Sequence, residues 1–294
     1  MMKKSVLALI LVVVSFSSHA QNDSYPYPSL SPLGKIVQNV GNTLIEIEYE
    51  RPAARKRQVF GGFVPWNKVW RTGAGHCTKI SFDSNVVVGG HKIAAGKYAL
   101  LTIPGKTEWT VILNRDTTLY GTAAYDPRKD VARFVTVPAK TERFYETLNI
   151  DIEILPNDAR IYLSWTDLQI SFDVETTTDD ELEKWIAEEL LTLKNKDSDI
   201  YAGAAEYLLY RGENFSDALK LADIAIELDA DNGWARRLKT KLYERQGRYD
   251  DALDEIQRSL DNVEGREYPD KREKENELLQ LRSELERIRK LKKE

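Results

Sequence analysis

The residues best suited to bind a ligand lie close together in segment 61–78, whose sequence is GGFVPWNKVWRTGAGHCT. Its glycines permit positive backbone φ angles and Pro65 removes a hydrogen-bond donor, so the segment is predicted to be a loop. Aromatic and basic side chains on a loop held by a rigid scaffold often form a binding surface. The candidate ligand-binding residues are Trp66, Lys68, Trp70, Arg71, Thr72 and His76.

The same loop also permits a structural interpretation. Trp66 and Trp70 could fill the end of a β-sheet core, since large aromatic side chains are mostly buried. Arg71 would then donate hydrogen bonds to buried carbonyl groups. The sequence leaves both interpretations open.

Catalytic and metal-binding residues are not predicted. Cys77 directly follows His76 at the start of an expected strand, and successive side chains of a strand point to opposite faces. The two are therefore badly placed to ligate one ion or to act as nucleophile and base. We expect no metal and no cofactor, and we favour a non-enzymatic protein. A hydrolase that uses His76 or nearby carboxylates is the alternative.

The first 20 residues have the pattern of a secretory signal peptide. Lys3 and Lys4 precede an apolar run at 6–14, and small residues follow before Gln21. This pattern predicts cleavage after Ala20 and a periplasmic or secreted protein. The apolar run is shorter than the roughly 20 residues of a membrane helix, and no later segment reaches that length, so no membrane span is expected.

Length and charge narrow the class of protein. A chain of 294 residues suggests two domains, and its formal net charge of −5 argues against a nucleic-acid partner. Cys77 is the only cysteine, so no intramolecular disulfide can form.

After a tether at 21–32, segment 33–176 is predicted to form the first domain. In Thr43–Glu50, TLIEIEYE, apolar and acidic residues alternate with the period of a half-buried strand. Further segments, with turns between them, bring the total to about nine short strands: 78–82, 86–88, 97–103, 109–113, 133–137, 148–154, 161–165 and 170–174. Half-polar strands without helices indicate an antiparallel β-sandwich or jelly roll.

Two blocks of this domain carry a resemblance to a known family. The runs RPAARKRQVFGGFVPWNKVWRTGA and IAAGKYALLTIPGKTEWTVILN resemble the bacterial family called domain of unknown function 2911, over about residues 30–175. The resemblance implies an exported protein whose sandwich continues into a helical tail, and it brings no catalytic residues. Relatives tend to have Asn and Glu after the RTGA block, where this chain has Gly75, His76 and Cys77.

From Asp179 the hydrophobic period changes to about 3.6, which predicts helices throughout 179–294. Phe215 and Ala218 are matched 34 residues later by Tyr249 and Ala252. This period resembles that of tetratricopeptide repeats, so the second domain is predicted to be an all-α helical-repeat domain.

A long last helix from about Pro269 is predicted to cap these repeats. It carries an apolar seam at near-heptad spacing, made of Leu278, Leu281, Leu285 and Ile288. The seam could pack on the preceding repeat or pair with a helix of another protein.

The sequence therefore predicts an exported, non-enzymatic binding or scaffold protein. The helical repeats would contact a protein partner, and the sandwich loop would hold a small molecule or a glycan. A carbohydrate-binding sandwich is an alternative that requires Trp66 or Trp70 to be exposed as a stacking platform, and the hydrolase with a site at 66–77 is another.

Overall fold

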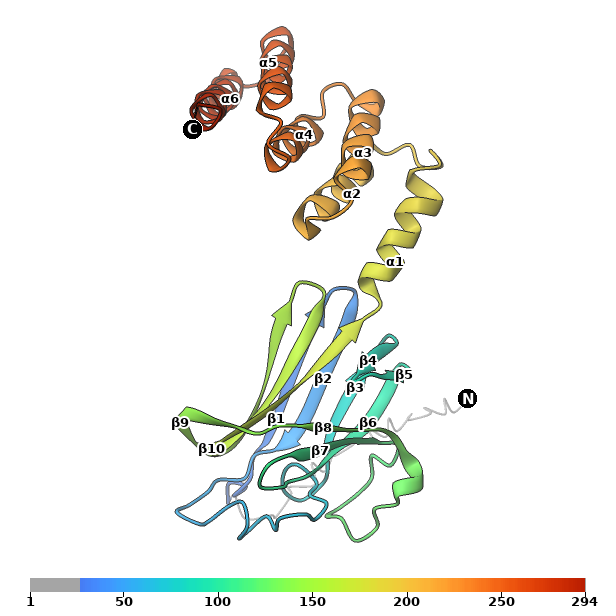
Figure 1. The fold of residues 1–294 in the computed structure, drawn as a ribbon, viewed down its shortest axis with the longest axis vertical. Coiled ribbons are helices and arrows are strands. Elements are labelled where there is room, and N and C mark those ends of the chain that lie inside the picture. The colour runs from blue at the N-terminus through green and yellow to red at the C-terminus, as the bar shows by residue number, and fades with distance from the viewer. Residues whose placement is uncertain (1–26, 294) are drawn as a thin grey trace, which may run out of the picture.

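The computed structural model describes residues 27–293, in which ten strands are followed by six α-helices. The expected order of a β domain and then an α domain is confirmed, and the two parts lie one above the other in Figure 1. The strands are β1 Leu33–Val40, β2 Thr43–Glu50, β3 Thr78–Phe82, β4 Val86–Val88, β5 His91–Ile93, β6 Gly96–Ile103, β7 Trp109–Asn114, β8 Asp130–Thr136, β9 Ala139–Leu155 and β10 Asp158–Thr176.

The strands form two antiparallel sheets. The larger has the order β1-β2-β3-β6-β7-β8 and the smaller the order β5-β4-β10-β9. In β2 the alternation seen in the sequence becomes alternating burial, with Ile45 and Ile47 fully buried. The inner faces of both sheets share one hydrophobic core, as expected for a sandwich.

Four strands differ from the sequence-based expectation. Strand β9 begins at Ala139, nine residues before the predicted segment 148–154. Segments 161–165 and 170–174 belong to the single strand β10, whose pairing with β9 shifts between Ser164 and Leu168. Two further strands, β1 and β5, had no counterpart in the prediction. In β1 the first seven residues are exposed or half-buried, so apolar residues do not alternate with polar ones there as they do in β2. Strand β5 has only three residues, too few to show a period.

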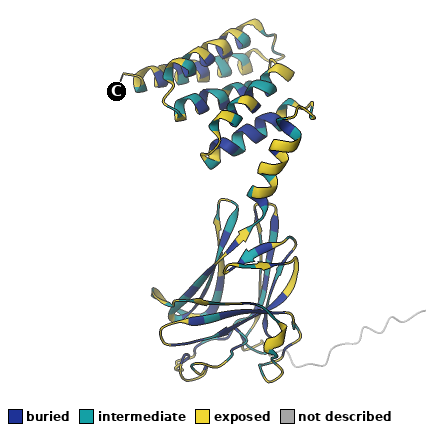
Figure 2. Cartoon of the chain, turned by 45° about the vertical axis from the view of Figure 1, so that its right-hand side comes forward, coloured by how far each residue is buried: buried dark blue, intermediate teal, exposed yellow. Residues whose placement is uncertain are grey.

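The helical part contains α1 Thr178–Trp185, α2 Ser198–Arg211, α3 Phe215–Leu228, α4 Gly233–Arg245, α5 Tyr249–Gly265 and α6 Lys271–Leu291. A π-helical turn, Ile186–Leu190, follows α1, which is largely exposed between the two domains (Figure 2). Helices α3 and α5 begin at Phe215 and Tyr249, the two aromatic residues that the repeat pattern aligned.

The last helix packs inside the chain. Leu281, Leu285 and Ile288 of α6 are buried in one cluster with Ile256 and Leu260 of α5. The apolar seam predicted from the sequence therefore covers the preceding helix. The helices are established, whereas the tetratricopeptide assignment stays a prediction.

Candidate functional site

The loop at 61–78 lies at the end of the sandwich that faces away from the helices (Figure 1). Trp70 in this loop is only 7% exposed and belongs to the main core. Its indole stacks on Trp165 at 5.8 Å between ring centroids and meets the edges of Phe60 and Trp109. Its Nε1 donates to the Gly73 carbonyl at 3.1 Å, which satisfies the buried donor. Trp70 therefore fills the core.

Trp66 is half-buried against the same cluster. Its ring stacks on Phe60 at 6.0 Å between centroids. Gly61 has a φ of +80°, and a Cβ there would lie 2.2 Å from Trp66 Nε1, so only glycine fits under the indole. This packing fixes Trp66 against the protein.

Arg71 departs from the structural interpretation of the loop, whereas the ligand-binding candidate Thr72 lies in the interior. Within residues 27–293 the Arg71 guanidinium has no hydrogen-bond partner and its Nε is buried, so the expectation that it feeds buried carbonyls is wrong. Thr72 is fully buried with a φ of +57°, a conformation that a β-branched residue rarely adopts. Its hydroxyl lies 3.1 Å from the Thr102 hydroxyl, and its carbonyl accepts a 2.7 Å hydrogen bond from Thr78. These bonds hold the RTGA turn.

The two remaining candidates, Lys68 and His76, are exposed. The His76 backbone N–H donates to Glu50 Oε1 at 3.1 Å, and its ring Nδ1 lies 3.6 Å from the same oxygen. The imidazole also meets the edge of Tyr120 at 5.1 Å between centroids. The structure therefore does not bring the six candidate residues to one surface.

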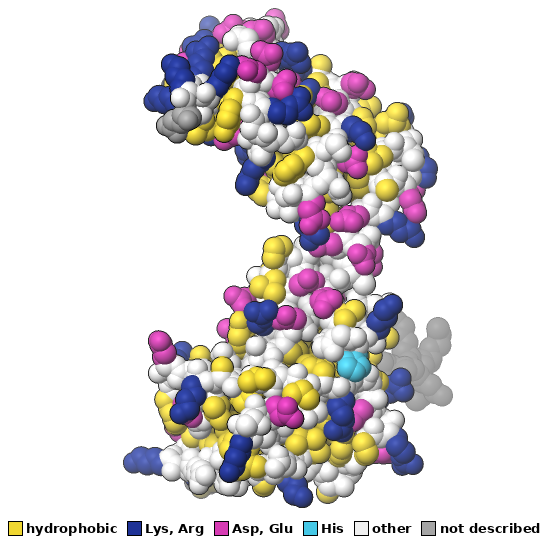
Figure 3. All heavy atoms as spheres, in the orientation of Figure 1, with side chains coloured by type: hydrophobic (Ala, Val, Ile, Leu, Met, Phe, Trp, Pro, Cys, Tyr) yellow, Lys and Arg dark blue, Asp and Glu magenta, His cyan; other side chains and the backbone are white. Residues whose placement is uncertain are grey.

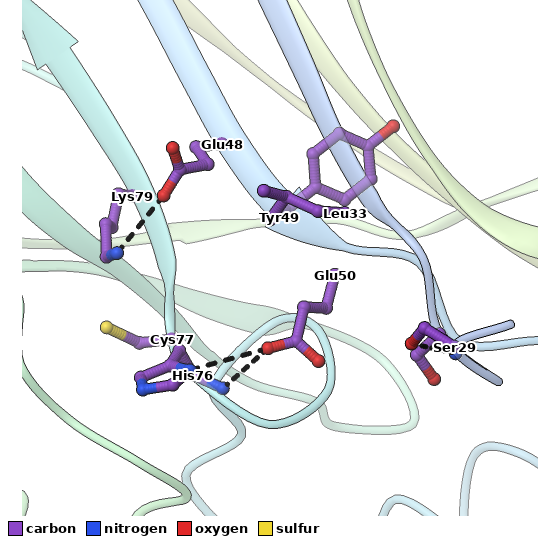
Figure 4. Close-up of a pocket in the computed structure, with 9 residues that line it drawn as sticks. Ser29, Leu33, Glu48, Tyr49, Glu50, His76, Cys77 and Lys79 are labelled. Atoms are coloured by element: carbon purple, nitrogen blue, oxygen red, sulfur yellow. Dashed lines mark hydrogen bonds and ion pairs between the residues drawn. The ribbon is translucent and has the colours of Figure 1, made fainter. Parts of the chain in front are cut away.

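Of the six, only His76 lines a cavity on the outer face of the larger sheet (Figure 4). The cavity has a volume of about 410 Å³, and charged and polar side chains share its wall with Leu33, Tyr49 and Cys77. Lys79 bonds to Glu48 at 3.1 Å and holds the pKa of that carboxyl below its usual value. The lining residues are Ser29, Ser31, Leu33, Glu48, Tyr49, Glu50, His76, Cys77 and Lys79.

The thiol in this cavity wall is not activated for nucleophilic attack. Burial raises the pKa of Cys77, and its Sγ is directed to the Thr117 carbonyl at 3.6 Å. Figure 4 shows the sulfur pointing away from the Glu50 carboxylate. Among residues 27–293, no three His, Cys, Asp or Glu side chains converge as metal ligands would.

A second cavity, of about 640 Å³, lies between the helices. We call it the helical groove. It is lined by Leu209, Tyr210, Lys241, Glu244, Arg245, Tyr249, Arg287 and Leu291, which come from α2, α4, α6 and the start of α5. Tyr210 is 71% exposed there, and Lys241 and Arg245 are also exposed.

Three basic side chains and one acidic side chain, Glu244, line the groove. Both oxygens of Glu244 accept hydrogen bonds of 2.7 Å from Arg287, which lowers the pKa of this carboxyl. Arg245 and Lys241 lower it further through their charge. Sequence reasoning missed this groove, although the four-residue spacing of Lys241 and Arg245 places them on one helix face.

None of the helices that the structure describes is long and apolar enough to cross a lipid bilayer. No protein of curated function matches the chain. Residues 31–174 match the family described as "Protein of unknown function (DUF2911)", over the two blocks that carried the resemblance. Through its β-sandwich, the chain belongs to this family.

Proposed function

We propose that this chain is an exported, non-enzymatic binding protein that contacts another protein through the helical groove. The observation that carries the proposal is the groove itself, which presents Tyr210 to solvent beside side chains of α4, α5 and α6. An exposed tyrosine beside basic groups is typical of protein interfaces, which are enriched in Tyr and Arg.

The sandwich would serve as the scaffold. The loop at 61–78 places Trp70 and Thr72 in the interior, and the Cys77 thiol lies buried against a carbonyl. These positions favour a structural role for the loop over a hydrolytic site.

Site-specific photo-crosslinking tests the protein-binding role. A photo-reactive amino acid at Tyr210, in the protein expressed in its native exporting cell, is expected to give a discrete crosslinked product. The control position is Lys220 on α3, which is exposed and does not line the groove. Equal crosslinking from both positions, or none from Tyr210, would count against the proposal.

Export itself is a separate part of the proposal and rests on the sequence of the first 20 residues, which lie outside the described part. Mass spectrometry of the protein recovered from periplasm and medium should show a chain that begins at Gln21. A cell-associated product that retains Met1 would contradict it.

We also propose that segment 179–294 is a domain that folds by itself. It contains two hydrophobic clusters, one around Tyr201 and one around Ile256, and the residues of both lie between 186 and 288. A fragment of 176–294 should therefore show a strongly helical circular dichroism spectrum, and a random-coil spectrum would refute independent folding.

A further inference from the structure

The basic residues of α4 divide between two faces of the helix. Arg236 and Lys239 turn toward α5, where they bind Glu255 at 3.1 and 3.3 Å. Glu255 is only 2% exposed, and Lys239 also reaches Asp223 at 2.6 Å. The charges on this face are therefore neutralised within the protein.

The other face of α4 carries Arg237, Lys241 and Arg245 at four-residue intervals. Arg237 approaches Glu277 at 3.7 Å. Lys241 and Arg245 are exposed and have no ion-pair partner within residues 27–293. The only acid in the wall of the helical groove is Glu244, and Arg287 occupies both of its oxygens. Two uncompensated positive charges thus face the groove.

The surroundings of these charges are partly apolar. Tyr210 projects from α2 on the far side of the groove, and Tyr249 and Leu291 complete the wall as half-buried side chains. Figure 3 shows hydrophobic side chains among basic and acidic ones over the upper end of the molecule, where α4, α5 and α6 lie. The groove therefore offers apolar contact area next to two cations.

The spacing of the two cations fits an extended chain. Residues four apart on a helix have Cβ atoms about 5 to 6 Å apart. In an extended peptide, side chains at positions i and i+2 lie on the same face and are roughly 6.5 to 7 Å apart. Two carboxylates at alternate positions can therefore reach Lys241 and Arg245 at the same time, while adjacent carboxylates point to opposite faces.

Building on the protein-contact role proposed above, we propose that the helical groove binds an extended acidic segment of its partner, with carboxylates at alternate positions. Lys241 and Arg245 each take one carboxylate, and an apolar side chain of the segment packs against Tyr210. The acidic surface around α1, visible at the waist of the molecule in Figure 3, disfavours binding of the same segment elsewhere on this face.

Fluorescence anisotropy with labelled peptides tests the charge pattern on the mature full chain. The probe is Gly-Leu-Glu-Ala-Glu-Leu-Gly with both ends blocked. Its isomer Gly-Leu-Glu-Glu-Ala-Leu-Gly has the same composition, and Gly-Leu-Lys-Ala-Lys-Leu-Gly reverses the charge. We expect measurable binding of the first, several-fold weaker binding of the isomer, and none of the lysine peptide.

The double variant Lys241→Glu and Arg245→Glu should weaken binding of the acidic probe roughly tenfold or more, because two attractions become repulsions. The control double variant Lys196→Glu and Lys271→Glu makes the same change in net charge at exposed residues outside the groove. It should bind like the wild type. If the reversal variant loses helical content, Lys241→Gln with Arg245→Gln replaces it and should still weaken binding.

Salt provides a second readout. Raising the salt concentration from about 0.1 M to about 1 M shortens the Debye length from roughly 10 Å to roughly 3 Å. The higher concentration should therefore weaken binding of the acidic probe. Equal binding of the acidic and lysine peptides, equal binding by the reversal variant and the wild type, or no binding of the acidic probe would overturn the proposal. A crosslink from Tyr210 in cells, together with any of these results, would leave the protein-contact role standing and remove only the acidic segment.

Discussion

Tyr207 in α2 donates a hydrogen bond of 2.7 Å to Oδ1 of Asp179, at the start of α1. The same carboxylate accepts hydrogen bonds from Arg211 of α2 and from Asn157, in the turn between β9 and β10. Thr178, the preceding residue, is buried and accepts a 2.9 Å hydrogen bond from the backbone of Asn42. The side chain of Asp179 thus connects the sandwich, α1 and α2.

We predict that Tyr207→Phe destabilises the helical domain by about 1 to 2 kcal/mol, because a hydrogen bond to a charged group is lost and Asp179 keeps one partner fewer. Thermal unfolding followed by circular dichroism measures the effect. Tyr210→Phe is the matched control, since Tyr210 lies in the same helix and is 71% exposed. Equal melts of the two variants would show that the Asp179 contact contributes nothing.

Trp70→Ala should destabilise the sandwich by about 3 to 5 kcal/mol, because it opens a cavity among the three aromatic rings of Phe60, Trp109 and Trp165. Denaturant unfolding followed by tryptophan fluorescence measures this change. Phe144→Ala, which removes an aromatic side chain that is 60% exposed in the same domain, should cost far less. A Trp70→Ala variant as stable as Phe144→Ala would mean that this indole does not support the core.

Arg71→Met should leave the stability of the sandwich unchanged or raise it, because it removes a buried Nε that has no acceptor among the described residues. Arg51→Met provides the contrast, since Arg51 donates to the Leu148 carbonyl and to Asn149 Oδ1, both at 3.2 Å. Arg51→Met should lower the free energy of unfolding by about 1 to 2 kcal/mol. Chemical denaturation measures the free energy of unfolding of both variants. A larger loss of stability for Arg71→Met than for Arg51→Met would contradict the prediction.

The pair of Glu244 and Arg287 should make the helical domain sensitive to acid. Its hydrogen bonds lower the pKa of Glu244 in the folded state from a value of 4.5, so the pair stabilises the fold above that pH. This contribution is lost as the pH falls through the lower folded value. Melting temperatures between neutral pH and about pH 3 should therefore fall more steeply for the wild type than for Glu244→Gln.

Glu286→Gln is the control for the acid experiment. Glu286 binds Arg289 within the same helix at 2.7 Å but is 62% exposed, so water screens the pair. The variant should follow the pH profile of the wild type. Parallel profiles of wild type and Glu244→Gln would refute the role of the groove pair.

The sequence by itself determined those features that depend on neighbours along the chain. Alternation in Thr43–Glu50 predicted β2 with its bounds, and the change of period near Asp179 predicted where helices begin, because backbone geometry repeats every two residues in strands and every 3.6 in helices. Burial follows from the same periods, so most of the sandwich core could be predicted as well.

Tertiary structure alone decided the surroundings of single side chains. Trp66 and Trp70 have the same chemistry in the same loop, yet only Trp70 reaches Trp165, which lies far along the chain on β10. Arg71 has no hydrogen-bond partner among residues 27–293, and this depends on what the folded chain places around its guanidinium. The helical groove joins Tyr210, Lys241 and Arg287 from three helices, and their proximity depends on how those helices pack, which no local pattern encodes.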